Sequence, residues 1–158
     1  MKHVPDATAD RTFNDSDNTV DRVGVDGLLS ELDENAIEEA LKIVEAGEGE
    51  VTVLTVGPEQ AVDAVRKGLQ MGAHRGVHVS DEAIHGSDAA ATSLVLAKAL
   101  EKLREEGDTA WDVVVCGMAS TDGSMGVLPA MLAERLDLPQ LTMASEVTVD
   151  GPKVTISR

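Results

Sequence analysis

Apolar residues recur with the period of an amphipathic helix in four stretches of the chain, at residues 34–45, 59–71, 88–106 and 123–136. In the first stretch, the apolar stripe consists of Ala36, Ile37, Ala40, Leu41 and Val44. In the third stretch, we expect the inward-facing stripe to be Ala91, Leu94, Val95, Lys98, Ala99 and Leu103. Asp88 is the predicted N-cap of this third helix, because its carboxylate can accept hydrogen bonds from the free N–H groups of the first turn.

Short runs rich in β-branched residues lie between these stretches and predict buried strands at residues 51–56, 76–79 and 111–116. The run at 111–116, Trp-Asp-Val-Val-Val-Cys, gives the strongest of these predictions. Three later runs predict strands at 141–143, 146–149 and 153–156. The last two flank an Asp-Gly-Pro turn and should form a hairpin. The first thirty residues are polar and poorly periodic, so we expect a long loop there without a buried strand.

Strands that alternate with helices of ten or more residues predict right-handed βαβ crossovers. The fold class is therefore α/β, with a three-layer arrangement in which helices cover both faces of a parallel sheet. No linker or internal repeat divides the sequence, and 158 residues are enough to bury a core. We expect a single domain over residues 1–158.

Acidic residues outnumber basic ones by 29 to 13, which gives a formal net charge of −16. Such a surface repels nucleic acid and anionic membranes, so a role in nucleic-acid binding is excluded. The acids are scattered along the chain, a pattern typical of a protein kept soluble at high salt and hence of a halophilic source; an ordinary acidic cytosolic protein is the alternative. The sequence has no apolar run of membrane-spanning length and no signal-peptide core, which indicates a soluble, cytoplasmic protein without membrane insertion.

The residues that usually hold metals or carry out nucleophilic chemistry are sparse. Cys116 is the one cysteine, and the four histidines are not at ligand spacing from one another. Cys116 ends a predicted buried strand, where a thiol more often fills apolar space than acts as a nucleophile. The sequence therefore predicts neither a metal centre nor a catalytic residue.

The loop at residues 117–126 is the strongest candidate for a binding site. It follows the best predicted strand, at the end of a parallel sheet where ligands bind. Its residues are Gly117, Met118, Ala119, Ser120, Thr121, Asp122, Gly123, Ser124, Met125 and Gly126. The glycines let the backbone approach a ligand, the hydroxyls can donate to phosphate oxygens, and N–H groups at a helix start favour an anion.

Two interpretations of this loop stay open on spacing alone. It lacks the lysine of a Walker A loop and does not match the dinucleotide fingerprint. It could bind phosphate, or it could be an ordinary connection in which Asp122 or Ser124 caps the following helix.

Six segments taken together resemble the beta subunit of electron transfer flavoproteins. They are residues 2–6 (KHVPD), 33–41 (DENAIEEAL), 50–58 (EVTVLTVGP), 64–76 (AVRKGLQMGAHRG), 112–117 (DVVVCG) and 119–123 (ASTDG). The resemblance covers essentially the whole chain, in the family's order, and corresponds to the N-terminal portion of that subunit.

The resemblance implies an adenine nucleotide alpha-hydrolase-like (Rossmann-like) fold and a heterodimer with an alpha subunit that carries FAD. It implies AMP as a structural cofactor of this subunit, and electron transfer from acyl-CoA or other dehydrogenases toward a quinone oxidoreductase, without catalysis by this chain. Carried over by position, the AMP phosphate loop would be 117–126, supported by Val56 and Asp33. The loop lacks the Gln of electron-bifurcating members, which favours AMP over a second FAD.

The chain also departs from the family pattern. The segment at 30–33 keeps Asp33 but not the usual Asn, and the first hydrophobic strand of the family has no counterpart ahead of Lys2. Family members also continue beyond residue 158, so we expect the domain to be incomplete at both ends.

Two other classes of protein with related folds fit less well. A stand-alone universal-stress-like nucleotide-binding module would carry a G-x2-G-x9-G-S/T pattern, which the sequence lacks. An adenylating ATP pyrophosphatase would need an S-G-G-x-D-S loop after its first strand, and that strand is absent.

Overall fold

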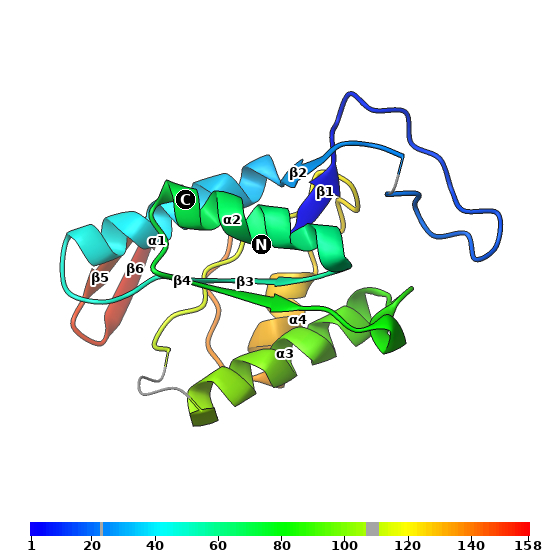
Figure 1. Ribbon diagram of the computed structural model, residues 1–158. Coiled ribbons are helices and arrows are strands. Elements are labelled where there is room, and N and C mark those ends of the chain that lie inside the picture. The colour runs from blue at the N-terminus through cyan, green and yellow to red at the C-terminus, as the bar shows by residue number, and fades with distance from the viewer. Residues whose placement is uncertain (23, 107–110) are drawn as a thin grey trace.

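The computed structural model describes residues 1–22, 24–106 and 111–158. At its centre, strands β3 (Thr52–Val56) and β4 (Arg75–Val79) form a parallel pair. Helices α1 (Glu31–Glu45) and α2 (Val62–Met71) cover one face of this pair, and α3 (Ala89–Glu106) and α4 (Leu128–Arg135) cover the other (Figure 1). The predicted α/β class and helical layers are confirmed.

Successive side chains of β3 point to opposite faces, as the two-residue period of a strand requires. Val53 packs on the α1–α2 side, in a cluster of buried residues that comprises Leu29, Ile37, Val51, Val53, Ala64, Val65 and Ala73. Leu54 packs on the other side, against Ala97, Leu100 and Leu132. The central strand therefore connects two separate apolar cores.

Several predicted boundaries are confirmed. A 3-10 turn, η1 (Glu59–Ala61), leads into α2, and Gly72 ends this helix with a φ of 121° that favours glycine. Asp88 caps α3, because its Oδ1 accepts a hydrogen bond from the Ala91 N–H at 2.8 Å. A second 3-10 turn, η2 (Glu82–Ile84), precedes that cap.

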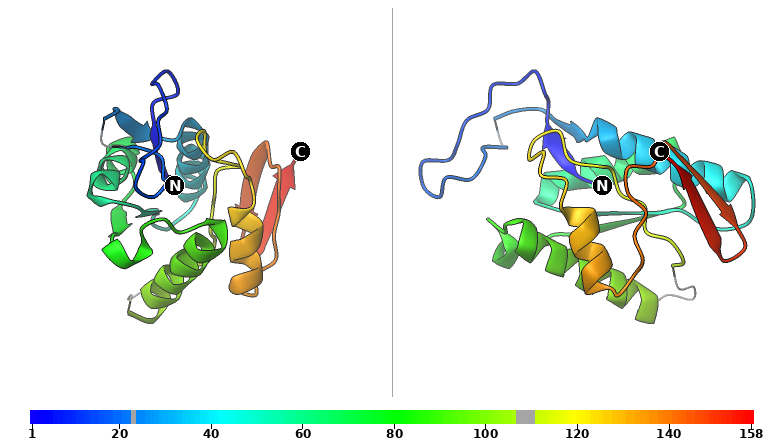
Figure 2. Two further views of the ribbon diagram at one scale, coloured as in Figure 1. Left: turned by 90° about the vertical axis from the view of Figure 1, so that its right-hand side faces the viewer. Right: turned by 180° about the vertical axis from the view of Figure 1, so that it is seen from behind.

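The predicted hairpin is also confirmed. Strands β5 (Glu146–Asp150) and β6 (Lys153–Ser157) pair in antiparallel register around a two-residue turn in which Gly151 has a φ of 55°. In the view from behind, the hairpin lies beside α1 (Figure 2).

The expectation of a structureless N-terminus is wrong. Strands β1 (His3–Pro5) and β2 (Gly27–Leu29) form an antiparallel pair, and Val4 is completely buried within it. Periodicity could not reveal this pair, because each strand is three residues long and the buried residues are only Val4 and Pro5 in β1 and Leu29 in β2. Between them, residues 6–22 and 24–26 form an irregular arm, with one isolated bridge between Phe13 and Val20.

Asp17, in this arm, connects it to the turn that precedes α3. Asp17 contacts His85 at 2.9 Å. Hydrogen bonds from His85 and Thr19 lower the pKa of Asp17 to about 2. Both side chains are exposed, so this contact orients the arm without adding a buried interaction.

The predicted continuous parallel sheet does not form among the described residues. They make three separate two-stranded sheets, and 111–116 is not a strand. A strand needs a hydrogen-bonded neighbour, whereas segment 112–117 and the edge of β3 opposite β4 face each other across a cavity. The Met1 ammonium group reaches into this space and donates to the Leu54 carbonyl oxygen at 3.0 Å.

Three further predictions need correction. Residues 141–143 are not a strand, since Met143 has a φ of 58°. The helix expected from residue 123 begins only at Leu128, because Ser124 and Gly126 adopt left-handed backbone conformations.

The buried face of α3 is also not the predicted stripe. Ser93, Ala97 and Leu100 are buried, whereas Leu94 is 45% exposed. Arg135 donates from Nε to the Ser93 hydroxyl at 2.8 Å, which satisfies a polar group on the packed face that hydrophobic periodicity could not register. Among the described helices, none combines the length and the apolar character needed to cross a bilayer.

An apolar strand supplied to the open edge of β3 should stabilise the protein. We expect six alternating Val and Ile residues, fused ahead of Met1, to raise the midpoint of thermal unfolding by several degrees. Burial of each such side chain contributes roughly 1.5–3 kcal/mol. Hydrogen exchange at Leu54 and Val114 should slow, because strand pairing protects amides. An unchanged midpoint, equal to that of a Gly/Ser extension of the same length, would show that the space does not accept a strand.

Candidate functional site

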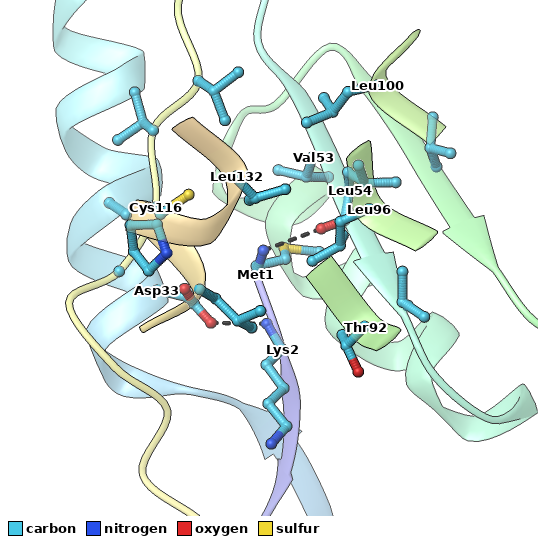
Figure 3. A pocket seen from close by; sticks show the side chains of 18 of the residues that line it. Met1, Lys2, Asp33, Val53, Leu54, Thr92, Leu96, Leu100, Cys116 and Leu132 are labelled. Carbon is cyan, nitrogen blue, oxygen red and sulfur yellow. Dashed lines mark hydrogen bonds between the residues drawn. The ribbon is translucent and has the colours of Figure 1, made fainter. Parts of the chain in front are cut away.

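The candidate loop at 117–126 lies at the C-terminal end of β3, beside the N-terminal strand β1. The view from behind shows the two segments next to each other (Figure 2). A cavity of about 1890 Å³ runs between β3 and segment 112–117 and extends to this loop (Figure 3). The loop thus lies at the end of the strand where the sequence places it, and its role as a binding site stays a prediction.

Most of the predicted site residues line this cavity. They are Asp33, Val56, Gly117, Met118, Ala119, Ser120, Gly123, Met125 and Gly126. Thr121, Asp122 and Ser124 belong to the same loop but do not lie on the wall. Of the three predicted hydroxyls, that of Ser120 therefore belongs to a residue on the cavity wall.

The loop residues that line the cavity include several with free backbone donors. The N–H groups of Gly117, Met118, Ala119, Met125 and Gly126 have no hydrogen-bond partner within the part of the chain that the structure describes. Unpaired N–H groups that line one concave surface bind anions well. This chemistry comes from the irregular loop, because α4 starts only at Leu128 and carries a proline in its first turn.

Gly117 is required where Asp33 approaches the loop. A Cβ atom at position 117 would lie 2.6 Å from Asp33 Oδ1 and 3.0 Å from the Leu32 carbonyl oxygen. Asp33 is buried in the first turn of α1 and accepts a hydrogen bond from the Lys2 backbone N–H at 2.7 Å. Asp33 therefore joins α1, the start of the chain and the loop at one point.

Asp122 is held by two cations from the N-terminal segment. Its carboxylate accepts from Lys2 Nζ at 2.8 Å and from Arg22 Nη2 at 2.9 Å, and its side chain is only 6% exposed. Burial works to raise the pKa of Asp122, but hydrogen bonds from Lys2, Ser120 and Arg22 and the charge of Lys2 outweigh it. The pKa of Asp122 therefore lies well below its usual value.

Sequence reasoning missed Lys2, Arg11 and Arg22 as neighbours of the loop. Lys2 also lies 3.5 Å from the Ser120 hydroxyl, and Arg11 donates to the Thr121 carbonyl oxygen at 3.4 Å. No spacing rule connects these basic residues to a loop about one hundred positions away. The one feature of the sequence that hinted at their role is that three basic residues lie within the first 22 residues of an acidic chain.

The remaining reactive side chains have structural roles or no activating partner. Cys116 lies on the cavity wall, and its removal from bulk water raises the pKa of the thiol, which disfavours a nucleophilic thiolate. His74 accepts from the Val51 N–H at 3.1 Å and so holds the start of β3. Among the described residues, no group of three His, Cys, Asp or Glu side chains could hold a metal ion.

Comparison with known proteins gives consistent matches. A family model described as "Electron transfer flavoprotein domain" matches residues 17–158. The chain is 46% identical over 163 residues to the electron transfer flavoprotein subunit beta of Mycobacterium leprae, and 38% identical over 160 residues to that of Megasphaera elsdenii. It is 40% identical over 161 residues to Protein FixA of Rhizobium meliloti.

These alignments cover 100% of the chain but only 59%, 59% and 54% of the three relatives, in the same order. The chain therefore spans less than two thirds of the length of the curated relatives that it matches.

Replacing Asp122 by Asn should destabilise the protein in a pH-dependent way. We expect a loss on the order of 2 kcal/mol at pH 7, typical of hydrogen bonds to a charged group. Because the folded-state pKa of Asp122 is depressed, its charge contributes stability above the ordinary pKa of 3.8, and this contribution is lost as pH falls further. Denaturant unfolding at pH 7 and pH 3 measures the difference between the two proteins.

The matched control is Asp63→Asn, which removes an exposed ion pair with Arg66. This change should alter stability by less than about 1 kcal/mol. An Asp122→Asn variant as stable as Asp63→Asn at pH 7 would contradict the role assigned to Asp122.

Proposed function

The chain belongs to the electron transfer flavoprotein family, and we propose that it is the nucleotide-binding portion of a beta subunit. In this role it binds AMP as a structural cofactor and pairs with an alpha subunit. FAD, held mainly by the alpha subunit, supplies the redox chemistry when bound. The chain itself acts in a cytoplasmic electron carrier and not as a catalyst.

The observation that carries this proposal is the set of unpaired N–H groups at the end of β3. Five loop residues whose N–H groups are unpaired within the described chain line the same cavity as Val56 and Ser120. A phosphate group offers several acceptor oxygens to such donors, and a glycine-rich backbone lets it approach closely. The residues present therefore fit the phosphate of a nucleotide.

The rest of the cavity suits the nucleoside part of AMP. Val56, Met118 and Met125 border it with apolar atoms, which provide a surface for a purine ring. Thr52–Leu54 and segment 112–117 form the walls further in. We propose that the complete fold is adenine nucleotide alpha-hydrolase-like and that a further strand occupies this inner space.

Exposed apolar side chains support a protein partner. Met118, Met125, Leu141 and Met143 are each more than half exposed, and all lie in the stretch 118–143. Apolar surface of this kind is typical of an interface. We propose that the alpha subunit covers it, and that acyl-CoA or other dehydrogenases deliver electrons that the heterodimer passes to a quinone oxidoreductase.

Co-expression with a candidate alpha subunit tests this function. The purified heterodimer should release one FAD and one AMP upon denaturation, measured by chromatography of the released nucleotides. Substituting Gly126 by Val, which strains a backbone with a φ of 64° in the proposed AMP loop, should lower the AMP content and spare the FAD.

Gly72→Val is the matched control, because Gly72 also has a positive φ, 121°, at the end of α2 and does not line the cavity. Release of two FAD molecules, or ATP turnover by the chain, would contradict the proposal.

A further inference from the structure

Two cations lie on the cavity wall, while the carboxylate that holds them does not. Lys2 and Arg22 line the cavity together with the loop, and Asp122 is absent from the wall. Exposure agrees with this placement: the side chains of Lys2 and Arg22 are 39% and 30% exposed, whereas that of Asp122 is 6% exposed. The two cations therefore stand between the enclosed carboxylate and the open space.

Both cations keep hydrogen-bond donors for a second anion. Arg22 uses Nη2 to reach Asp122, and a guanidinium group has five N–H donors in all. Lys2 Nζ reaches Asp122 and, at a longer 3.5 Å, Ser120, so one of its three donors is unused. Lys2 and Arg22 carry two positive charges against the single carboxylate of Asp122, while the other carboxylate beside the loop, Asp33, accepts from the Lys2 backbone N–H.

Arg75 also lines the cavity, but it lies far from Lys2 and Arg22 along the strand pair. Arg75 lies at the opposite end of the strand pair, beside Thr52, and pairs with Glu50 at 3.2 Å. Among the described residues that line the cavity, Lys2 and Arg22 are thus the lysine and arginine at the end where Val56 and the loop lie. In a chain with a net charge of −16, these two side chains are cations with which an anionic ligand at this end can pair.

We infer that Lys2 and Arg22 bind the anionic group of the nucleotide, and that Asp122 is a positioning residue that holds both cations toward the cavity. The inference rests on the proposed nucleotide site and adds the side chains that distinguish a nucleotide from a nucleoside. The loop amides and the two cations would contact the phosphate from different sides. Charge-assisted hydrogen bonds of this kind are about twice as strong as neutral ones.

Calorimetric titration of the heterodimer, freed of nucleotide, with AMP and with adenosine tests the inference. Lys2→Met and Arg22→Gln should each weaken AMP binding about tenfold and change adenosine binding less than twofold. Lys2→Arg and Arg22→Lys keep the charge and should retain most of the preference for AMP. The matched control Arg66→Gln removes an arginine that pairs with Asp63 on the surface of α2, and it should change neither affinity.

The same titrations of an Asp122→Asn variant test whether Asp122 positions the two cations. Asp122→Asn should lower the affinity for AMP and leave that for adenosine unchanged, because the cations lose their orientation. A rise in AMP affinity would show that Asp122 competes with the phosphate and would overturn its positioning role.

Other outcomes distinguish failure of the roles of Lys2 and Arg22 from failure of the nucleotide site itself. Unchanged AMP affinity in Lys2→Met and Arg22→Gln, or an equal loss for AMP and adenosine, would overturn the inference while the nucleotide site stands. Absence of binding of both compounds to the unmodified protein would overturn the proposed function and the inference with it.

Discussion

The ion pairs of Asp122 with Lys2 and Arg22 hold the candidate site together. They join the loop that follows segment 112–117 to Lys2 and Arg22, which precede Asp122 by 120 and 100 positions in the chain. A carboxylate that is 6% exposed is costly to bury unless it is paired, so loop and N-terminal segment must be ordered together. Asp33 fixes the same two segments from the other side, through the Lys2 backbone N–H and its close approach to Gly117. The geometry of the cavity mouth follows from these contacts.

Local sequence patterns predicted those elements whose stability is largely local. The helices α1 and α2, the capped start of α3, the strand β3 and the β5–β6 hairpin follow from periodicity, capping and turn residues. Predictions failed where a partner distant in the chain decides the structure. Segment 111–116 has the composition of a strand, but the described residues give it no neighbour to pair with. Conversely, Val4 is buried because β2 pairs with β1, which a single valine in a polar segment could not indicate.

The same distinction applies to the site. Glycines and hydroxyls identified the loop at 117–126, because backbone access and donors are properties of the loop itself. Its cations could not be predicted, since Lys2 and Arg22 reach it only through the folded arrangement. Nor could composition show that Thr121, Asp122 and Ser124 lie off the cavity wall, because this depends on how the loop folds against the N-terminal segment. Asp122, predicted as a ligand-binding residue or a helix cap, forms ion pairs with Lys2 and Arg22, which line the cavity.

In the function proposed above, the loop at the end of β3 binds the phosphate of an adenine nucleotide. Backbone amide chemical shifts of the isotopically labelled protein, followed during titration with AMP, test it most directly. If AMP binds there, we expect saturable changes in chemical shift that are largest at Gly117–Ala119, Met125–Gly126 and Val56. Saturable shifts centred elsewhere, for example on the β5–β6 hairpin, or none at millimolar AMP, would contradict it.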